Sequence, residues 1–311
     1  GSVSLASQQI RLAWWMKERY GSTMNQALKT VLPVKQQVRQ KEKKVLKCLL
    51  SREELELAVA EAARKHYKAR ERLLRAFTEM EEIPYEMVTG QMNLTAASMK
   101  PLVEKGIISV EAETMYRNPE ISGSGYKTAV SLNPAQTAVA EDFKNRYDQG
   151  IRETSLLYGV TGSGKTEVYM EMIRHVLAKG RQVIVLIPEI ALTYQTVLRF
   201  YRQFGRQVSV INSRMSAGER YDQFERAEKG DVTVMIGPRS ALFTPFPKLG
   251  LIVIDEEHEP TYKSEQIPRY HARETAVERA NLEGASVVLG SATPSLEAFY
   301  RAQKGEYELL R

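Results

Sequence analysis

Cysteine is nearly absent from this sequence, in which Cys48 is the single example among 311 residues. One cysteine excludes an internal disulfide and a zinc site built from several cysteines, so a reducing, cytosolic context is the default. The histidines His66, His175 and His271 lack the spacing of metal ligands. No run reaches the roughly 18 apolar residues of a membrane span, and no signal peptide opens the chain. We therefore expect a cytoplasmic protein without a membrane partner.

Excess positive charge is confined to the N-terminal segment. Residues 1–50 contain ten basic and two acidic side chains, a net charge of +8, whereas the whole chain carries +6 and the remainder therefore −2. A basic segment of this kind can attract a phosphate backbone, but it can equally be a solvated linker. The charge pattern leaves both interpretations open.

The length of 311 residues suggests about two domains, since a domain averages roughly 150 residues. The apolar spacing within residues 3–32 predicts one or two short amphipathic helices, divided at Gly21 and ended by Pro33. A basic connector is expected over residues 34–50. We treat residues 1–50 as a helical remnant of a preceding domain together with this linker.

A small α+β domain is predicted over residues 51–117. Ser51 and Glu54 have the spacing of a capping box, which opens a helix. The apolar positions that follow keep helical spacing for about 28 residues. Two shorter helices and two small strands complete a winged-helix order, with the elements expected at residues 85–90, 94–105, 107–110 and 114–116. Such a domain can bind DNA through its third helix or wing, and a protein-contact module remains the alternative.

Beyond a Pro/Gly/Ser-rich linker at residues 118–131, the pattern over residues 132–311 changes to short apolar runs that alternate with helical segments. Near-continuous Val/Ile/Leu runs are typical of a parallel sheet buried on both faces. The fold class is therefore α/β, with a doubly wound parallel sheet. The expected strands lie at residues 155–159, 183–187, 208–211, 232–236, 251–255 and 286–290.

The segment Gly159–Thr166 reads GVTGSGKT and matches the P-loop motif between a predicted strand and a predicted helix. Its glycines, together with the helix N-terminus, allow backbone N–H groups to surround phosphates. In this motif the lysine contacts the β- and γ-phosphates, and the Ser/Thr hydroxyl binds Mg²⁺. The residues that we expect to bind ATP and Mg²⁺ here are Gly162, Ser163, Gly164, Lys165 and Thr166.

A pair of carboxylates closes the predicted strand at residues 251–255. Asp255 and Glu256 then lie at the carboxyl edge of the sheet, where α/β proteins bind ligands. Asp255 can hold Mg²⁺ through water, and Glu256 can polarise an attacking water as a general base. With Lys165, these two residues form the predicted catalytic set.

The motifs around these residues resemble the DExH branch of superfamily 2 helicases. Asp255–His258 reads DEEH, and Ser-Ala-Thr follows at residues 291–293. Three segments are similar to the replication-restart helicases within that branch. They are IPEIALT at 187–193, GPRSALF at 237–243 and the stretch from the DEEH motif to Arg273. The resemblance covers roughly residues 50–311 and implies a P-loop, RecA-like first motor lobe.

The resemblance also assigns roles to individual residues. Gln136 is placed where these enzymes read adenine, and His258 is expected to bridge the ATP site to Ser291 and Thr293. A loop of aromatic and basic residues after the DEEH motif is expected to stack on single-stranded bases and to couple DNA to hydrolysis. The residues implied in DNA binding or coupling are Thr193, Arg239, Ser240, His258, Tyr262, Lys263, Arg269, Tyr270, Ser291 and Thr293.

Replication-restart helicases are ATP-driven 3′→5′ bacterial DNA helicases that recognise stalled forks and begin primosome assembly. The resemblance therefore implies ATP and Mg²⁺ as cofactors. It implies forked DNA with a junction of single strand and duplex, single-strand-binding protein (SSB) and primosome proteins as partners. The second motor lobe with its arginine finger, and the zinc-binding cysteines, are not within these 311 residues. We expect this chain to bind nucleotide and DNA, to hydrolyse ATP poorly and not to unwind DNA alone.

Two alternatives stay open. One is another DExH translocase, such as a restriction or repair motor. The other is a non-catalytic fork-binding module with a vestigial nucleotide site, against which the intact Lys165, Thr166, Asp255 and Glu256 argue. A GTPase is disfavoured because the Asn-Lys-x-Asp guanine motif is absent from the sequence.

Overall fold

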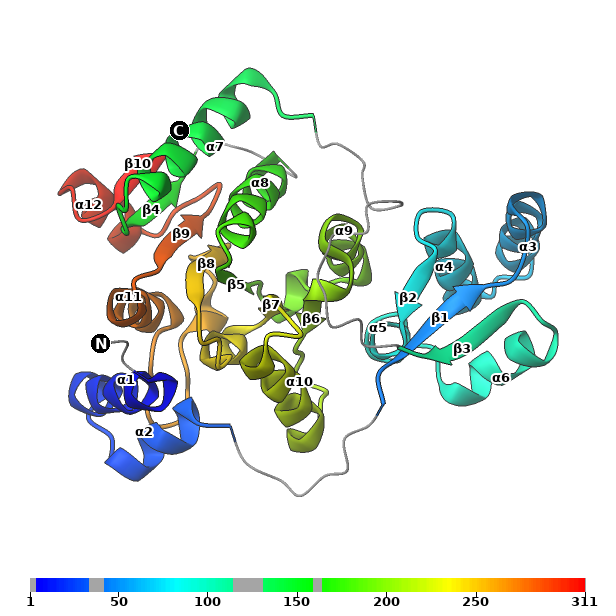
Figure 1. Ribbon diagram of the computed structural model, residues 1–311, viewed down its shortest axis with the longest axis horizontal. Coiled ribbons are helices and arrows are strands. Elements are labelled where there is room, and N and C mark those ends of the chain that lie inside the picture. The colour runs from blue at the N-terminus through cyan, green and yellow to red at the C-terminus, as the bar shows by residue number, and fades with distance from the viewer. Residues whose placement is uncertain (1–3, 34–41, 114–130, 159–163, 311) are drawn as a thin grey trace. The chain divides into compact units, whose positions relative to one another are not determined.

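The computed structural model describes residues 4–33, 42–113, 131–158 and 164–310. The chain forms two compact units (Figure 1). Unit 1 comprises residues 1–37, 130–192 and 206–311, and unit 2 comprises residues 38–129 and 193–205. Among the helices of these described ranges, none has the length and apolar character that a membrane crossing requires.

Unit 1 is built on a seven-stranded parallel sheet with the order β10-β4-β9-β8-β5-β7-β6. All six predicted strands are confirmed, because each continuous apolar run is buried in this sheet. One short edge strand, β10, was not predicted, and it pairs with β4. The strands are β4 (Thr154–Leu157), β5 (Gln182–Leu186), β6 (Val208–Val210), β7 (Val234–Gly237), β8 (Leu249–Asp255), β9 (Ser286–Gly290) and β10 (Glu308–Leu310).

Helices cover both faces of this sheet. In Figure 1, α7 and α8 lie on one side of it and α11 on the other. The alternation of side chains along β8 follows this arrangement, since Ile252 and Ile254 share a core cluster with residues of α11. Val253 and Asp255 therefore face the α8 side. The helices of this unit outside the N-terminal segment are α7 (Pro134–Asp148), α8 (Gly164–Ala178), α10 (Ala217–Lys229), α11 (Ala272–Glu283) and α12 (Leu296–Gln303), with short 3₁₀ turns η1 (Glu189–Ala191), η2 (Gly205–Gln207), η3 (Arg239–Phe243) and η4 (Pro260–Tyr262).

The N-terminal segment forms a helical hairpin that packs into unit 1. Helices α1 (Leu5–Tyr20) and α2 (Met24–Val31) are separated at Gly21, as predicted, and Gly21 takes the left-handed C-cap conformation with φ 68°. Helix α1 contacts α11, and the buried residues Leu12 and Met16 belong to the same core cluster as the buried alanines of α11. The hairpin is thus a packed part of unit 1.

Unit 2 contains a three-stranded antiparallel sheet with the order β2-β1-β3 and several short helices. The Ser51–Glu54 capping box is present. The expected long helix is divided into two at His66, which has a positive φ of 57°. The elements are β1 (Lys44–Cys48), α3 (Arg52–Arg64), α4 (Lys68–Phe77), β2 (Glu82–Pro84), α5 (Tyr85–Gly90), α6 (Ala96–Glu104), β3 (Ile108–Ala112) and α9 (Tyr194–Phe204).

Strand β1 lies where the sequence analysis expects a basic connector. Val45 and Leu46 are buried in this strand, so apolar burial outweighs the charge of the lysines around them. The basic segment 1–50 is consequently shared between the two units. The strand expected at residues 114–116 falls outside the described residues.

We predict that Met16→Ala destabilises unit 1. The Met16 side chain is fully buried between α1 and the motor core, and truncating a buried methionine costs about 2–5 kcal/mol through lost burial and the cavity left behind. Denaturant unfolding of the 311-residue chain measures the free energy of unfolding directly.

Arg11→Ala is the matched control, because Arg11 lies exposed on the same helix. Its effect should stay within about 0.5 kcal/mol. If Met16→Ala were as mild as Arg11→Ala, the hairpin would not be part of the motor core.

Candidate nucleotide site and adjoining loop

Lys165 lies in the first turn of α8, and its side chain is only 5% exposed. Its Nζ is 2.7 Å from Glu256 Oε1 and 3.6 Å from Asp255 Oδ1. The three predicted catalytic residues therefore meet at the carboxyl end of β8, although they come from segments about ninety residues apart. Gly162 and Ser163 of the motif lie outside the described residues.

Asp255 is held from the α8 side by Tyr169, whose hydroxyl donates to Asp255 Oδ1 at 2.8 Å. Asp255 is in register with Gly290 of the neighbouring strand β9. A Cβ at position 290 would overlap the Tyr169 hydroxyl, so only glycine leaves room for this bond. Gly290 is thus required by the close approach of a tyrosine to the sheet.

Burial governs the protonation of this pair. It raises the pKa of Asp255, while the Lys165 ammonium and the Tyr169 hydroxyl act in the opposite direction and favour the carboxylate. Burial and the nearby Asp255 carboxylate raise the pKa of Tyr169 well above its ordinary value. Tyr169 is therefore a neutral hydrogen-bond donor at physiological pH.

The chain turns sharply at Glu256, which adopts a left-handed conformation with φ 48°. A positive φ is costly for a residue with a side chain and is concentrated at functional sites. The next residue, Glu257, is only 1% exposed, and its N–H donates to the Gly290 carbonyl at 3.1 Å. The turn therefore directs Glu256 towards Lys165 and Glu257 into the interior.

Glu257 anchors the segment that follows the Ser-Ala-Thr motif. Its carboxylate accepts from Arg273 Nη1 at 3.0 Å, from the Ser295 N–H at 2.7 Å and from the Ser295 hydroxyl at 3.0 Å. Arg273 also bonds Glu297 at 2.8 Å. This buried network ties the DEEH turn to the start of α11 and to α12.

His258 joins the carboxylates to the Ser-Ala-Thr segment. Its Nδ1 lies 2.7 Å from Ser291 Oγ, and its Nε2 lies 3.6 Å from Glu256 Oε2. The Ser291 hydroxyl in turn accepts from the Thr293 N–H at 3.1 Å. The structure therefore brings His258, Ser291 and Thr293 together beside Glu256.

Gln136 connects the first turn of α7 to the start of α8. Its Nε2 donates to the Gly164 carbonyl at 3.1 Å, and its Oε1 accepts from the Asn133 N–H at 2.8 Å. The side chain is 7% exposed, so it is not an exposed helix glutamine. This contact places it beside the P-loop, while adenine reading stays a prediction.

The donor set suits a magnesium ion held mainly by phosphates. The described residues contain no group of three or more Asp, Glu, His or Cys side chains able to hold a metal alone. Mg²⁺ bound with a nucleotide usually needs only one or two protein oxygens. Thr166, next to Lys165, and the carboxylate of Asp255 could supply these oxygens.

The loop after the DEEH turn is fixed to the site by Tyr262. The Tyr262 side chain is 1% exposed, and its hydroxyl is 2.6 Å from the main-chain carbonyl oxygen of Asp255 and 3.1 Å from that of Leu186. The hydroxyl thus bonds the same residue whose carboxylate faces Lys165. Burial, followed by the nearby carboxylates, raises the pKa of Tyr262 and keeps it neutral.

Arg239 and Tyr270 complete the support of this loop. Arg239 Nη1 donates to the carbonyls of Thr261 and Lys263, both at 2.8 Å, and its guanidinium lies 5.5 Å from the centre of the Tyr270 ring. Tyr270 is 5% exposed and packs edge-on against Phe243 at 5.3 Å. Arg239 therefore holds protein backbone in this structure, and its contact with DNA remains a prediction.

Burial corrects one expectation about these tyrosines. Stacking on a base needs an exposed ring face, and Tyr262 and Tyr270 have none to offer because both rings pack in the core. The exposed residues of the loop instead include two basic side chains, Lys263 and Arg269, together with Glu265, Gln266 and Ile267. A role of the tyrosines in coupling is still a proposal, but as anchors of the loop.

Two other predicted DNA contacts lie elsewhere. Ser240 is half-buried in η3 beside Arg239. Thr193 caps α9, where its Oγ1 accepts from the Thr196 N–H at 3.3 Å. Because contacts assign residues 193–205 to unit 2, the structure does not bring Thr193 into the cluster around Lys165.

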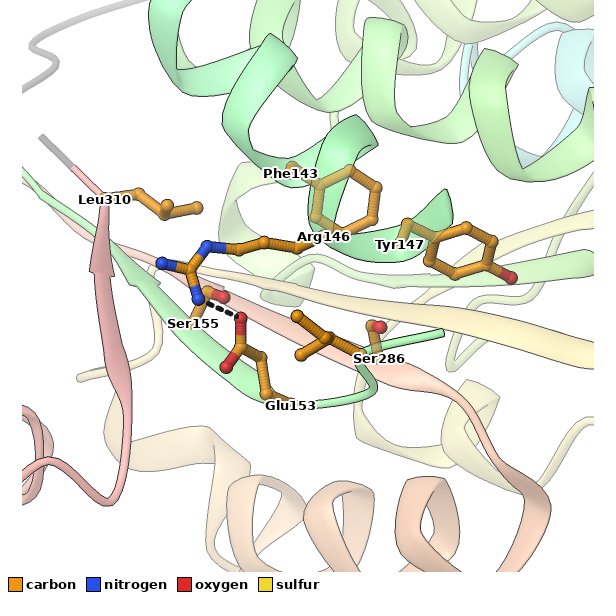
Figure 2. Close-up of a pocket in the computed structure, with 8 residues that line it drawn as sticks. Phe143, Arg146, Tyr147, Glu153, Ser155, Ser286 and Leu310 are labelled. Atoms are coloured by element: carbon orange, nitrogen blue, oxygen red, sulfur yellow. Dashed lines mark hydrogen bonds and ion pairs between the residues drawn. The ribbon is translucent and has the colours of Figure 1, made fainter. Parts of the chain in front are cut away.

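A small pocket opens elsewhere on unit 1, between α7 and the strands β4, β9 and β10. Figure 2 shows Arg146 reaching across it to Glu153, with the two charged groups 3.0 Å apart. Arg146 is also paired with Asp142 and Glu308. Ser155 and Ser286 line the pocket near the amino ends of their strands, whereas Lys165 lies at the carboxyl end of the sheet. We therefore interpret this pocket as structural.

Sequence reasoning missed three residues that shape the site. Tyr169 lies one turn after Lys165 on the buried face of α8, so helical spacing was a usable signal. Glu257 sits between two predicted site residues and gave no sign that it alone points inward. Arg273 was part of the family resemblance, but its buried bond to Glu257 depends on tertiary contacts.

The fold and this cluster define a motor lobe with a P-loop. The DEAD/DEAH box helicase family matches residues 133–301, and the chain belongs to that family. The sequence is similar to the replication restart protein PriA of Bacillus subtilis (strain 168), with 46% identity over 230 residues, 74% of this chain and 29% of that protein. PriA of Chlamydia pneumoniae is 34% identical over 99% of this chain and 42% of its own length. The chain thus spans less than half the length of these relatives.

Among solved structures, RecG bound to a three-way DNA junction aligns with 58% of this chain and 23% of its own chain. The TM-score is 0.43 and the sequence identity 22%.

We predict that Lys165→Ala weakens the binding of Mg-ADP. The substitution removes the ammonium that the motif directs at phosphates, and a lost charge-assisted contact should weaken binding by at least about tenfold. Isothermal titration calorimetry of the 311-residue chain measures the affinity. Lys179→Ala, which removes an exposed lysine just beyond α8, is the control and should bind like the wild type. Equal affinities for all three proteins would refute the assignment of the P-loop.

We also predict that His271 makes the chain less stable in mild acid. Burial, followed by the charge of Arg273, lowers the pKa of His271 to about 4, and its Nδ1 accepts from the Arg273 N–H at 3.1 Å. An unfolded histidine has a pKa of about 6.5, so only the unfolded state takes up this proton between those values. The stability is therefore intact above pH 6.5 or so and is lost as the pH falls towards about 4.

His271→Asn keeps an acceptor at this helix N-cap but cannot titrate. The free energy of unfolding, measured from about pH 7 to pH 5.5, should fall less steeply in this variant than in the wild type. His66→Asn changes an exposed histidine and should leave the slope unaltered. Identical slopes for His271→Asn and the wild type would contradict the prediction.

Proposed function

We propose that this chain is the first motor lobe and the preceding module of an ATP-driven 3′→5′ DNA helicase. The helicase would act at stalled replication forks in the bacterial cytoplasm and begin primosome assembly there. The proposal is supported by the similarity of the chain to replication restart proteins PriA. The second lobe, a zinc site, SSB and primosome partners belong to the proposal for the whole protein.

The observation that carries the proposal is the continuous connection between the P-loop lysine and the loop after the DEEH turn. Lys165 pairs with the carboxylates of Asp255 and Glu256, and Tyr262 bonds the Asp255 carbonyl at 2.6 Å. Arg239 then holds the backbone on either side of Tyr262 through the carbonyls of Thr261 and Lys263. A motor needs such a link, because nucleotide hydrolysis and movement on DNA must affect one another.

The residues of the cluster have distinct roles in the proposed reaction. Lys165 would bind phosphate oxygens, and Thr166 with Asp255 would hold a magnesium ion that accompanies the nucleotide. When bound, that ion would neutralise charge on the phosphates. Glu256 orients the attacking water and accepts its proton, while His258 keeps Glu256 in register with Ser291. The Tyr169 hydroxyl donates a hydrogen bond to the Asp255 carboxylate and so fixes its position.

Contact with DNA is proposed for the exposed basic residues of the loop. Lys263 and Arg269 face solvent, and phosphate groups attract such side chains. Unit 2, which we interpret as a winged-helix module, adds the basic helix α4 with Lys68, Arg70 and Arg72. DNA bound at the loop would pull on Tyr262 and so reach the carboxylates without entering the nucleotide site.

We predict that Glu256→Gln in the full-length protein abolishes DNA-stimulated ATP hydrolysis and fork unwinding but retains nucleotide binding. Losing a general base costs about 10²–10⁴ in rate, whereas the amide still accepts a hydrogen bond from Lys165. Steady-state ATPase assays with and without forked DNA, a strand-displacement assay and ADP calorimetry give the three readouts.

Glu265→Gln is the control, since Glu265 is exposed in the same loop and should be dispensable. A wild-type protein that binds forks but never hydrolyses ATP would favour the non-catalytic alternative. Hydrolysis stimulated equally by duplex and forked DNA, without unwinding, would favour a translocase of another kind.

A further inference from the structure

The last residue of α1, Tyr20, bonds the base of the loop that we propose to contact DNA. Its hydroxyl donates to Glu274 Oε2 at 2.6 Å and accepts from the His271 N–H at 3.2 Å. Arg19 pairs with the other oxygen of the Glu274 carboxylate at 3.1 Å. The end of α1 therefore makes three polar contacts with the start of α11.

The same tyrosine ring also contacts the opposite side of the loop. Lys263 Nζ lies 5.2 Å from the centre of the Tyr20 ring, and Lys263 forms an antiparallel bridge with His271. Trp15 packs edge-on against the ring at 5.7 Å, which fixes its orientation. Both ends of the segment 263–271 thus meet at Tyr20.

Within this segment, the backbone is closed by its own hydrogen bonds. The Ser264 N–H donates to the Tyr270 carbonyl at 2.8 Å, and the Ser264 hydroxyl donates to the Gln266 carbonyl at 3.0 Å. Arg239 holds Lys263 from the motor side, and Tyr20 holds it from the α1 side. Lys263, at the start of the segment that exposes Arg269, is consequently held by two separate residues, Arg239 and Tyr20.

We propose that Tyr20 is a positioning residue for DNA-stimulated hydrolysis, because α1 braces the base of the loop 263–271 against the motor lobe. The inference rests on the proposed function of this loop. When the two ends of the loop, Lys263 and His271, are held by Tyr20, DNA bound near Arg269 can displace Tyr262 and Asp255. When the ends are not held, the same binding displaces only the loop. Burial and the bond to Glu274 raise the pKa of Tyr20 to about 12, so the hydroxyl keeps its proton at physiological pH.

The test uses Tyr20→Phe in the full-length protein. This change keeps the ring, and with it the contacts to Lys263 and Trp15, but removes the hydroxyl. We expect the DNA-stimulated kcat to fall by about three- to tenfold, the effect of losing the hydrogen bond to Glu274, while the rate without DNA and the affinity for ADP stay unchanged. A merely structural tyrosine would alter stability but not this ratio of stimulated to unstimulated rates.

Tyr300→Phe is the matched control, since Tyr300 is a tyrosine exposed on α12 and should behave like the wild type. Tyr20→Phe and Glu274→Ala should be non-additive, because both remove the same bond. In the 311-residue chain, hydrogen exchange at the amides of residues 263–271 should speed up in Tyr20→Phe and not in Tyr300→Phe.

The outcomes separate the two proposals. A wild-type protein that DNA does not stimulate overturns the proposed function and the inference with it. A wild-type protein that is stimulated, with Tyr20→Phe stimulated equally, overturns the inference alone. Unchanged exchange in the loop of Tyr20→Phe also overturns it, because the brace is then absent.

Discussion

The ammonium of Lys165 is buried at the carboxyl end of the sheet, and a charge in that position requires negative partners close by. Asp255 and Glu256 provide them, and this pairing constrains the elements around it. Strand β8 must end beside the first turn of α8, and the chain must reverse at Glu256 in an unfavourable conformation. Gly290 must leave room for Tyr169. Each of these features serves to hold the Lys165 ammonium beside its carboxylate partners.

The loop after the DEEH turn contains both buried tyrosines and exposed basic side chains. Tyr262 and Tyr270 are buried and bind the loop to the sheet edge and to η3, while Lys263 and Arg269 remain exposed. A ring that stacked on DNA would have to leave the core at each binding event, at the cost of its burial. In the proposed function, the buried tyrosines hold the loop backbone and the exposed basic side chains contact DNA. Contact at the surface can then reach the carboxylates through packed side chains.

The N-terminal hairpin, which precedes the small domain in the chain, packs into unit 1. Its helices were predicted as the remnant of a preceding domain, yet α1 and α2 bury Leu12, Met16 and Val31 in the core of unit 1. The chain thus leaves the motor lobe at α2, forms the small sheet and helices of unit 2, and returns to the motor at α7. Contacts at Tyr20 make this hairpin a neighbour of the proposed DNA loop.

Features that depend on short stretches of chain could be predicted from the sequence alone. The P-loop motif, the six buried strands, the split at Gly21 and the position of Asp255 and Glu256 at a strand end all follow from local spacing and from alternation along a strand. The tertiary structure decided which side chains are exposed and which are paired across the chain. The burial of Tyr262 and Tyr270, the inward turn of Glu257, the pairing of β1 with β2 and β3, and the bond from Tyr20 to Glu274 join residues as far as 254 positions apart. A local pattern cannot report these contacts, because burial and pairing are set by the other segments that pack there.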